Sequence, residues 1–392
     1  MKKTFQIFTG FLAVLGLLAV LCLPVPVYAA EMTITAPSGI LMEQSTGKVL
    51  YEKDADTPRR PASVTKIMTI LLAYEAVRDG QATMEDMVSV SKNAASYGGS
   101  TILLEEGEQI QLSNLIKGMC IASGNDAAIA TAEYIGGSQE GFVDMMNKRA
   151  EELGMKNTHF VNPCGLDADG HVTTARDIAL MSRELMTQFP QVTEYTTTWH
   201  EMMPHVWRSG PGETDMANTN KLIQSYEGMT GLKTGFTRLA KYSLSATATR
   251  GDLSLIAVVM GAETKDQRSS DVTAMLNYGF GSYALQTVET DGQSAGMVKV
   301  KGGMQGEVGA AVQGNLQLLS PKTAQADPAS LETRIDLAPS VEAPVAAGDP
   351  LGTITYLQDG KEVGTLPLIA VSDVEESSLW KILSLLFGQW LG

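Results

Sequence analysis

A serine and a lysine, Ser63 and Lys66, stand three residues apart at the start of an apolar run, residues 67–77. The run contains good helix formers and almost no charge, and Gly80 follows it, so it predicts a helix that is mostly buried. Residues i and i+3 share one face of a helix, so both side chains would point the same way. Burial favours a neutral lysine amine, and a neutral amine beside a hydroxyl is a base–nucleophile pair. Ser-x-x-Lys is common by chance, so a surface serine beside a snorkelling lysine is the simpler interpretation of this segment alone.

Residues 1–29 have the pattern of a secretory signal peptide. Lys2 and Lys3 precede an apolar segment, residues 11–23, and small residues suit cleavage before residue 30. Pro24 and Pro26 end the apolar segment too early for a membrane-spanning helix. We therefore expect the mature protein to be secreted and to work on the extracytoplasmic face of the cytoplasmic membrane.

Composition narrows the classes of partner. The formal charge of the 392-residue chain is −15, and it becomes −17 without Lys2 and Lys3, which argues against nucleic-acid binding. Cys120 and Cys164 remain after processing and could pair in an oxidising compartment. We favour two free, buried thiols, because neither cysteine lies in a small disulfide-type scaffold. The length predicts two or three domains.

The order of predicted elements indicates an α+β domain over residues 30–284. Two short strands, residues 34–41 and 48–51, form a predicted hairpin ahead of the helix that carries Lys66. Helices are predicted over residues 112–121, 127–135, 142–153 and 174–186, and Ser123 and Asn125 lie on the turn between the first two. Such a turn could expose its polar side chains to a cleft or be an ordinary connector.

The second half of this domain is predicted to be mainly strands. Residues 199–218 are polar and are expected to be irregular. Three strands follow, residues 228–237, 242–248 and 253–260, with Lys233 on the first, and a helix over residues 272–280 closes the domain. The expected architecture is an antiparallel sheet with a helical cluster.

The composition changes after residue 281. Short Val-, Gly- and Pro-rich segments and an Asp359-Gly360 turn predict a small all-β domain over residues 285–372. Residues 373–392 end in an amphipathic segment, residues 379–391, with Trp380 and Trp390. This segment is too short to span a bilayer and is expected to lie on the membrane surface as an anchoring helix. The alternative is a terminal helix that docks on its own domain.

Three motifs now stand in order: Ser63-Val64-Thr65-Lys66, Ser123-Gly124-Asn125 and Lys233-Thr234-Gly235. Together they resemble the motif set of penicillin-binding proteins and class A β-lactamases. The chain most resembles the low-molecular-weight penicillin-binding proteins, the serine-type D-alanyl-D-alanine carboxypeptidases of peptidase family S11, and among them the sporulation-associated type. The resemblance extends to residues 61–69, 122–127, 162–166 and 231–235, to His171, to the C-terminal β domain and to the tail.

This resemblance implies a β-lactamase/transpeptidase-like catalytic domain and a catalytic role for three residues. Ser63 would attack the carbonyl between two D-alanines and form an acyl-enzyme. Lys66 would take the serine proton, and Ser123 would relay protons to the leaving D-alanine. The mechanism implies neither a metal nor another cofactor.

The resemblance also implies a substrate-binding role for Asn125, Lys233, Thr234 and Gly235. Asn125 would hold the substrate amide, Lys233 and Thr234 would bind the terminal carboxylate, and Gly235 would let the substrate approach the strand. An oxyanion hole would form from the Ser63 N–H and a second N–H near Phe236 or Thr237. The partners implied are peptidoglycan stem peptides and, as covalent inhibitors, β-lactam antibiotics.

The chain departs from the family pattern after the third motif. Lys241-Tyr242-Ser243 stands where the family commonly has a cysteine as the third residue, and Arg238-Leu239 replaces a small or acidic pair. The first change puts thiol sensitivity of the site in doubt, and the second could alter the rim of the cleft.

Three other functions were weighed. A class A β-lactamase needs a glutamate in the loop after the second motif, and residues 157–166 contain no Glu or Asp. A zinc peptidase is suggested by His200 and His205, but these are five residues apart and Pro204 would break a helix between them. A non-catalytic cell-wall-binding protein would have lost at least one motif, whereas all three are intact.

Overall fold

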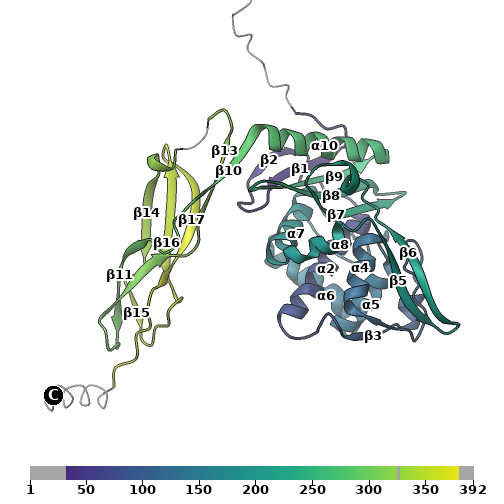
Figure 1. Cartoon of the computed structure of the whole chain (residues 1–392), viewed down its shortest axis with the longest axis horizontal. Helices are drawn as coiled ribbons and strands as arrows, with labels where there is room; N and C mark the ends of the chain where they lie inside the picture. The colour runs from purple at the N-terminus through teal and green to yellow at the C-terminus, as the bar shows by residue number, and fades with distance from the viewer. Residues whose placement is uncertain (1–31, 325–326, 379–392) are drawn as a thin grey trace, which may run out of the picture. The chain divides into compact units, whose positions relative to one another are not determined.

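The computed structural model describes residues 32–324 and 327–378 (Figure 1). The expected signal peptide at residues 1–29 and the expected amphipathic segment at residues 379–391 lie outside the described residues. Within the described ranges, no helix is both long enough and apolar enough to cross a membrane.

A five-stranded antiparallel sheet forms the centre of the first part of the chain, in the order β2-β1-β9-β8-β7. Its strands are β1 (Ser38–Glu43), β2 (Val49–Lys53), β7 (Met229–Thr237), β8 (Lys241–Arg250) and β9 (Leu253–Ala262). The predicted N-terminal hairpin and the three later strands are confirmed. The two groups join because β1 pairs with β9, with Ile40 opposite Val258. Strand β9 is apolar and almost wholly buried, as expected for a strand that is covered on both faces.

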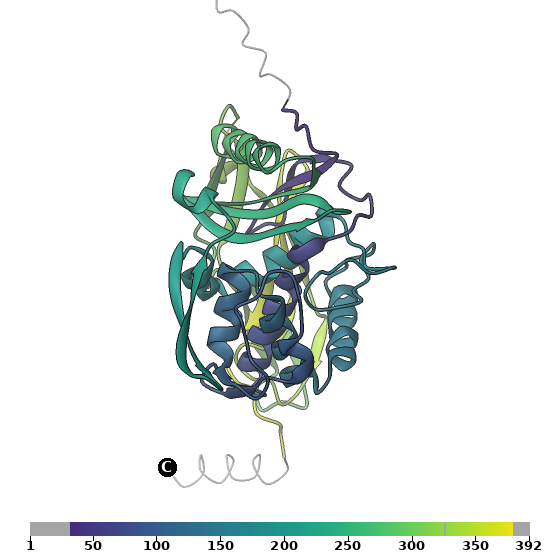
Figure 2. The same cartoon turned by 90° about the vertical axis from the view of Figure 1, so that its right-hand side faces the viewer.

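Helices cover this sheet on both sides (Figures 1 and 2). Helix α10 (Lys265–Ser282) packs on one face, and α7 (Ala175–Gln188) packs on the other as part of a cluster. The other long helices of the cluster are α2 (Lys66–Arg78), α4 (Leu112–Ile121), α5 (Asn125–Gly136) and α6 (Gln139–Glu152). The α+β expectation is confirmed, although α10 begins seven residues earlier than the predicted helix, after Thr264, whose side chain caps it.

Helix α2 explains the apolar run that follows the first motif. It contacts α4, α5, α6 and α7, and every residue from Lys66 to Ala76 is buried. A helix enclosed on all sides needs apolar residues all round, so its sequence lacks the alternation of a surface helix. A short 3-10 turn, Ala62–Thr65, precedes it and carries Ser63.

The expectation that residues 199–218 are irregular is wrong. They form a hairpin of β5 (His200–Trp207) and β6 (Gly210–Ala217), with Met203 opposite Thr214. Buried and outward-facing residues alternate along both strands, but polar residues, two prolines and two glycines obscure the alternation in the sequence. A two-stranded hairpin consists of edge strands, so it tolerates proline.

The segments that connect these elements contain short helices and strands. They include β3 (Met87–Ser89), β4 (Gln109–Gln111), α3 (Lys92–Ala95), α8 (Thr193–Thr196) and α9 (Leu222–Ser225). Strands β3 and β4 pair with each other, so the segment between them begins and ends at one place in the fold.

The described residues after α10 form strands, as expected, apart from one 3-10 turn (Pro328–Ser330). Strands β10 (Tyr283–Val288) and β13 (Leu316–Pro321) pair with each other. A six-stranded sheet has the order β14-β16-β17-β12-β11-β15. Its strands are β11 (Ser294–Lys301), β12 (Glu307–Val312), β14 (Glu332–Leu337), β15 (Ser340–Glu342), β16 (Pro350–Gln358) and β17 (Lys361–Ala370). The predicted Asp359-Gly360 turn is confirmed, since both residues have positive φ (51° and 72°) and join β16 to β17.

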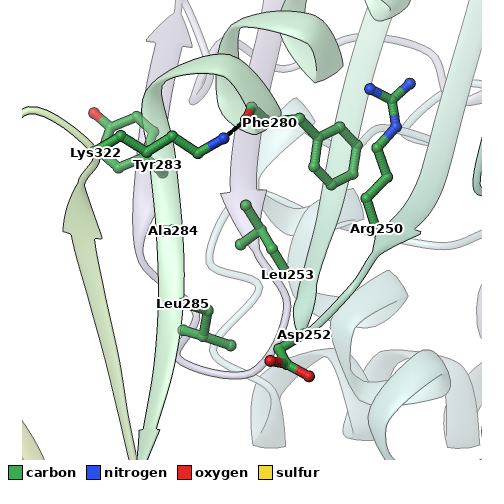
Figure 3. Close-up of a pocket in the computed structure, with 8 residues that line it drawn as sticks. All are labelled: Arg250, Asp252, Leu253, Phe280, Tyr283, Ala284, Leu285 and Lys322. Carbon is green, nitrogen blue, oxygen red and sulfur yellow. Dashed lines mark hydrogen bonds between the residues drawn. The ribbon is translucent and has the colours of Figure 1, made fainter. Parts of the chain in front are cut away.

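Side chains around the end of α10 fix the start of β10 (Figure 3). Lys322 Nζ donates a hydrogen bond to the Phe280 carbonyl at 2.7 Å, which satisfies a carbonyl in the last turn of the helix. The Arg250 guanidinium lies 4.7 Å from the centroid of the Phe280 ring and 4.8 Å from that of Tyr226. Arg250, Phe280 and Lys322 border a pocket of about 360 Å³ that is separate from the cleft described below.

Candidate active site

Ser63 and Lys66 meet as their spacing predicts. Ser63 lies in the 3-10 turn and Lys66 is the first residue of α2, and Lys66 Nζ donates to Ser63 Oγ at 3.1 Å. Ser63 is partly exposed, whereas Lys66 is completely buried. The hydroxyl can therefore reach a ligand in the cleft while its amine neighbour stays away from bulk water.

Burial sets the chemistry of Lys66. Its ammonium also donates to Asn125 Oδ1 at 2.6 Å and to the Cys164 carbonyl at 2.7 Å. All three acceptors are neutral oxygens, and the loss of hydration lowers the pKa of Lys66 to about 8. An amine with such a pKa is partly unprotonated near neutral pH and can accept the proton of Ser63.

The second motif lies on the turn between α4 and α5, as expected. Asn125 begins α5, and its side chain is held by Lys66 on one side and by the Gly98 carbonyl, 2.7 Å from Nδ2, on the other. The Asn125 backbone N–H donates to the Ser100 carbonyl at 2.7 Å. These bonds set the orientation of the Asn125 amide.

The third motif reaches the second through Lys233. Strand β7 carries this lysine, whose Nζ donates to Ser123 Oγ at 2.8 Å and to the Thr234 carbonyl at 3.0 Å. Lys233 is buried, and burial, with the nearby charge of Lys66, lowers its pKa. Ser123 therefore lies beside an amine that can hold or release a proton.

Thr234 and Gly235 line the open side of β7. Thr234 Oγ1 donates to Thr219 Oγ1 at 2.7 Å. A Cβ on Gly235 would lie 2.9 Å from the Pro61 carbonyl oxygen and 3.2 Å from the Ala62 Cβ, so glycine lets β7 pack closely on the turn that carries Ser63. Strand β7 is an edge strand, which leaves one row of its backbone groups unpaired by the sheet.

Several of these residues line a cleft of about 530 Å³. One further residue that lines it was not suggested by the sequence. Ser63, Ser123, Thr234 and Gly235 line it together with Arg268, from the first turns of α10. Arg268 is buried, its pKa is lowered by burial, and its Nε has no hydrogen-bond partner among the described residues. In the sequence it is a single arginine in a polar helix start, 35 residues beyond Lys233, so no local pattern identifies it.

The loop of residues 157–169 packs against the turn that carries Ser63. Asn162 Oδ1 accepts hydrogen bonds from the backbone N–H groups of Gly165 (2.7 Å) and Leu166 (3.2 Å). Gly165 has φ of +90°, and a Cβ there would lie 1.9 Å from the Ala62 carbonyl oxygen. The loop thereby presents a backbone carbonyl to Lys66, where a β-lactamase of class A would need a carboxylate.

His171 connects this loop to the first motif. Its Nε2 lies 2.9 Å from Thr65 Oγ1, and its Nδ1 accepts the Val161 backbone N–H at 2.8 Å. An accepting Nδ1 requires the hydrogen to be on Nε2, so the ring is neutral. Burial lowers the pKa of His171 to about 4.

The departures from the family pattern lie near the cleft. Ser243 is buried, and Tyr242 stacks on Phe236 with ring centroids 4.3 Å apart. Phe236 and Tyr242 line the cleft, and Leu239 is 65% exposed beyond it. Cys120 and Cys164 are free, buried thiols, as expected, and burial raises the pKa of both.

The two histidines that suggested a zinc site, His200 and His205, point in different directions. Five residues apart on strand β5, they point to opposite faces: His200 is exposed and pairs with Asp215, and His205 is buried against Glu108. They cannot converge on one ion from these positions.

Comparisons with known proteins agree with this geometry. The chain matches the D-alanyl-D-alanine carboxypeptidase family over residues 26–264 and the penicillin-binding protein 5 C-terminal domain over residues 283–376. It is 40% identical to D-alanyl-D-alanine carboxypeptidase DacF of Bacillus subtilis, over 92% of this chain and 91% of that protein.

Solved structures show the same fold. Penicillin-binding protein 5 from Haemophilus influenzae superposes with a TM-score of 0.72 at 28% identity, over 89% of this chain and 100% of that chain. A DD-transpeptidase of Streptomyces K15 superposes with a TM-score of 0.60 at 31% identity, over 64% of this chain and 100% of that one. The chain therefore belongs to the D-alanyl-D-alanine carboxypeptidase family, and it is a serine-type DD-carboxypeptidase.

Proposed function

We propose that Ser63, Lys66 and Ser123 carry out acyl transfer in this cleft. The neutral Lys66 amine removes the Ser63 proton, and Oγ bonds to the carbonyl carbon between the two D-alanines. The carbon–nitrogen bond then breaks, and Ser123 passes a proton to the departing amine. Water hydrolyses the resulting ester and regenerates Ser63. The observation that carries this proposal is the 3.1 Å contact between Ser63 Oγ and a buried lysine whose pKa is lowered to about 8.

The oxyanion is held by backbone N–H groups in this proposal. Its donors are the Ser63 N–H and an N–H of β7 near Phe236 or Thr237. Gly235 supports this arrangement, because the absence of a side chain keeps β7 close to the Ser63 turn. Donors held in place by the fold stabilise the developing charge at little reorganisation cost.

The substrate lies extended along β7 in this proposal. The free backbone groups of this edge strand pair with the peptide, as in strand addition, and Asn125 binds a substrate amide. The terminal carboxylate lies near Thr234, where Lys233 supplies positive charge from behind. Arg268 supports direct binding of the carboxylate, because its buried guanidinium lines the cleft and its Nε has no partner in the described part of the chain.

We infer that the physiological substrate is the peptidoglycan stem pentapeptide, from which the enzyme removes the last D-alanine, and that β-lactams acylate Ser63. The penicilloyl ester is expected to persist. The loop after the second motif offers Lys66 the Cys164 carbonyl and contains no carboxylate before Asp167 to activate water.

We further propose a secreted enzyme made of a catalytic domain (30–284), a β domain (285–372) and a tail (373–392) that lies on the membrane surface. The sporulation-associated type also stays a prediction. A protein of residues 30–392 should float with phosphatidylglycerol vesicles, and a variant that ends at residue 378 should not. Equal flotation of both chains would contradict the role of the tail.

The decisive experiment for the activity uses a synthetic stem pentapeptide that ends in D-Ala-D-Ala. Residues 30–392 should release D-alanine, and this release should vanish in Ser63→Ala and after incubation with penicillin. A folded wild-type chain that releases no D-alanine would refute the carboxypeptidase proposal. Steady consumption of penicillin would instead favour a β-lactamase.

A further inference from the structure

Two buried polar side chains join the β5–β6 hairpin to the loop of residues 98–108, here called the 98–108 loop. His205 Nδ1 lies 2.7 Å from Glu108 Oε1, and the two side chains are 0% and 1% exposed. Removing one partner of a buried hydrogen-bonded pair is destabilising, so this contact keeps the end of the loop against the hairpin. The other oxygen of Glu108 accepts the Glu105 backbone N–H at 3.1 Å. His205 is also one of the two histidines that suggested a zinc site.

The hairpin holds the same loop at further points, one of which is the Arg208 backbone N–H, which donates to Glu105 Oε2 at 2.9 Å. The indole N–H of Trp207 donates to the Leu103 carbonyl at 3.0 Å, and Thr214 Oγ1 donates to the Ile102 carbonyl at 3.0 Å. The rings of Trp207 and His205 stack with centroids 4.9 Å apart. Side chains from both hairpin strands therefore bind the outer side of the loop.

The inner side of the 98–108 loop is bonded to the second motif. The Asp126 carboxylate accepts the backbone N–H groups of Ile102 (3.0 Å) and Leu104 (3.1 Å). The carbonyls of Ser100 and Gly98 accept the backbone N–H and the side-chain amide of Asn125, both at 2.7 Å. Asn125 in turn accepts the Lys66 ammonium. The loop is thus the shared partner of the hairpin and of the asparagine that contacts the catalytic lysine.

We propose that His205 and Glu108 are positioning residues for the reaction, because they hold the 98–108 loop in the place that orients the Asn125 amide towards Lys66. This inference rests on the proposed roles of Asn125 and Lys66. If the contacts between the hairpin and the 98–108 loop are lost, the carbonyls of Gly98 and Ser100 shift and the Asn125 amide turns with them. A misplacement of about 1 Å at reacting groups can slow a reaction about 100-fold.

Two substitutions at His205 separate positioning from packing. His205→Phe keeps a ring that can stack on Trp207 but removes the donor to Glu108. His205→Asn loses the ring but places an amide N–H near the position of Nδ1. The readout is D-alanine release by residues 30–392 per penicillin-titrated site, so that unfolded protein is not counted. We expect kcat to fall at least tenfold in His205→Phe with KM changed less than threefold, and to recover most of its value in His205→Asn.

A milder substitution keeps the test valid if His205→Phe does not fold. Trp207→Phe retains a ring and removes one hydrogen bond to the loop, and we expect kcat per titrated site to fall about threefold. Tyr226→Phe is the matched control, since it also removes one hydrogen bond, from its hydroxyl to Asn277 Oδ1 at 2.9 Å, away from the loop. Its kcat should equal that of the wild type.

The outcomes distinguish this inference from the proposed function. Normal kcat in both His205→Phe and Trp207→Phe, beside a slow Asn125→Ala, would overturn the positioning role alone. An Asn125→Ala variant as fast as the wild type would refute the role of Asn125 and this inference with it. A pattern in which His205→Asn is slower than His205→Phe would show that ring packing, and not the bond to Glu108, is what matters.

Discussion

The ammonium of Lys233 donates to the hydroxyl of Ser123 at 2.8 Å, although 110 residues separate them in the chain. The contact ties the edge strand of the sheet to the turn between two helices, so the cleft has a fixed width at this point. It also occupies one of the three hydrogens of Lys233, and a second is given to the Thr234 carbonyl at 3.0 Å. Lys233 is therefore oriented towards Ser123, the proposed proton relay, and in the proposed mechanism a second cation, Arg268, meets the substrate carboxylate.

Arg268 should discriminate between substrates by their terminal carboxylate. In Arg268→Leu we expect kcat/KM for a peptide ending in D-Ala-D-Ala to fall about 100-fold or more, because a charge-assisted pair is lost. The same peptide with a C-terminal carboxamide should be a poor substrate for the wild type and should lose little more in the variant. Kinetics with the two peptides on both enzymes test this, and an equal loss for both peptides would assign Arg268 a structural role.

The pKa of Lys66 should control the pH dependence of acylation. With a pKa of about 8, only about a tenth of the amine is neutral at pH 7, and this fraction rises with pH. The second-order rate of acylation by penicillin should therefore rise about tenfold per pH unit below pH 8 and level off above it. Lys66→Arg should lose acylation by about 1000-fold or more, since arginine stays protonated. A rate that does not change between pH 6 and 9 would argue against Lys66 as the base.

His171 should make the protein less stable in mild acid. Its pKa is lowered to about 4 in the folded protein, and its ordinary value is 6.5. Between these values the unfolded chain binds a proton that the folded chain does not, so the free energy of unfolding falls as the pH falls from 6.5 to 4. The loss is about 3 kcal/mol, and it is complete below pH 4.

A His171→Gln variant isolates this contribution from that of the carboxyl groups. The variant should be less stable at pH 7, because the bonds to Thr65 and Val161 are disturbed. In urea unfolding at several pH values, the difference in free energy of unfolding between the wild type and the variant should become smaller towards pH 4.5. Two stability curves that stay parallel over this range would contradict the assigned effect.

Two glycines with positive φ should respond very differently to alanine. Gly165→Ala places a Cβ 1.9 Å from the Ala62 carbonyl oxygen, so the backbone beside Ser63 must move. Gly80→Ala carries a similar conformational strain (φ +72°) in open space. We expect Gly80→Ala to cost about 1–2 kcal/mol and to keep full activity per titrated site. Gly165→Ala should cost more than about 3 kcal/mol and acylate at least tenfold more slowly. Urea unfolding measures the stability of each variant, and reaction with penicillin measures its acylation. Similar results for the two variants would mean that the loop backbone can shift to accommodate a side chain at Gly165.

Local patterns determined most of what the sequence could predict. Helix α2 is apolar on all sides, so its apolar run predicted it. The strands could be predicted from their periodicity and from turn residues such as Asp359 and Gly360. The β5–β6 hairpin was missed because Pro204, Gly210 and Pro211 interrupt the alternation of its few buried residues. Its strands exist through pairing with each other and through contacts such as Thr214 with Ile102, which no local window contains.

The sequence by itself predicted that Ser63 and Lys66 meet, because they are one turn apart and helical geometry brings them together. Their roles as nucleophile and base are part of the proposal. It also indicated the family, through three motifs in a fixed order. Tertiary structure alone decided that Lys233 contacts Ser123, that Arg268 enters the cleft, and that the β5–β6 hairpin supports the loop bonded to Asn125. The physical reason is that burial and long-range contacts, which set pKa values and orient side chains, depend on how distant segments pack and leave no periodic signal in the chain.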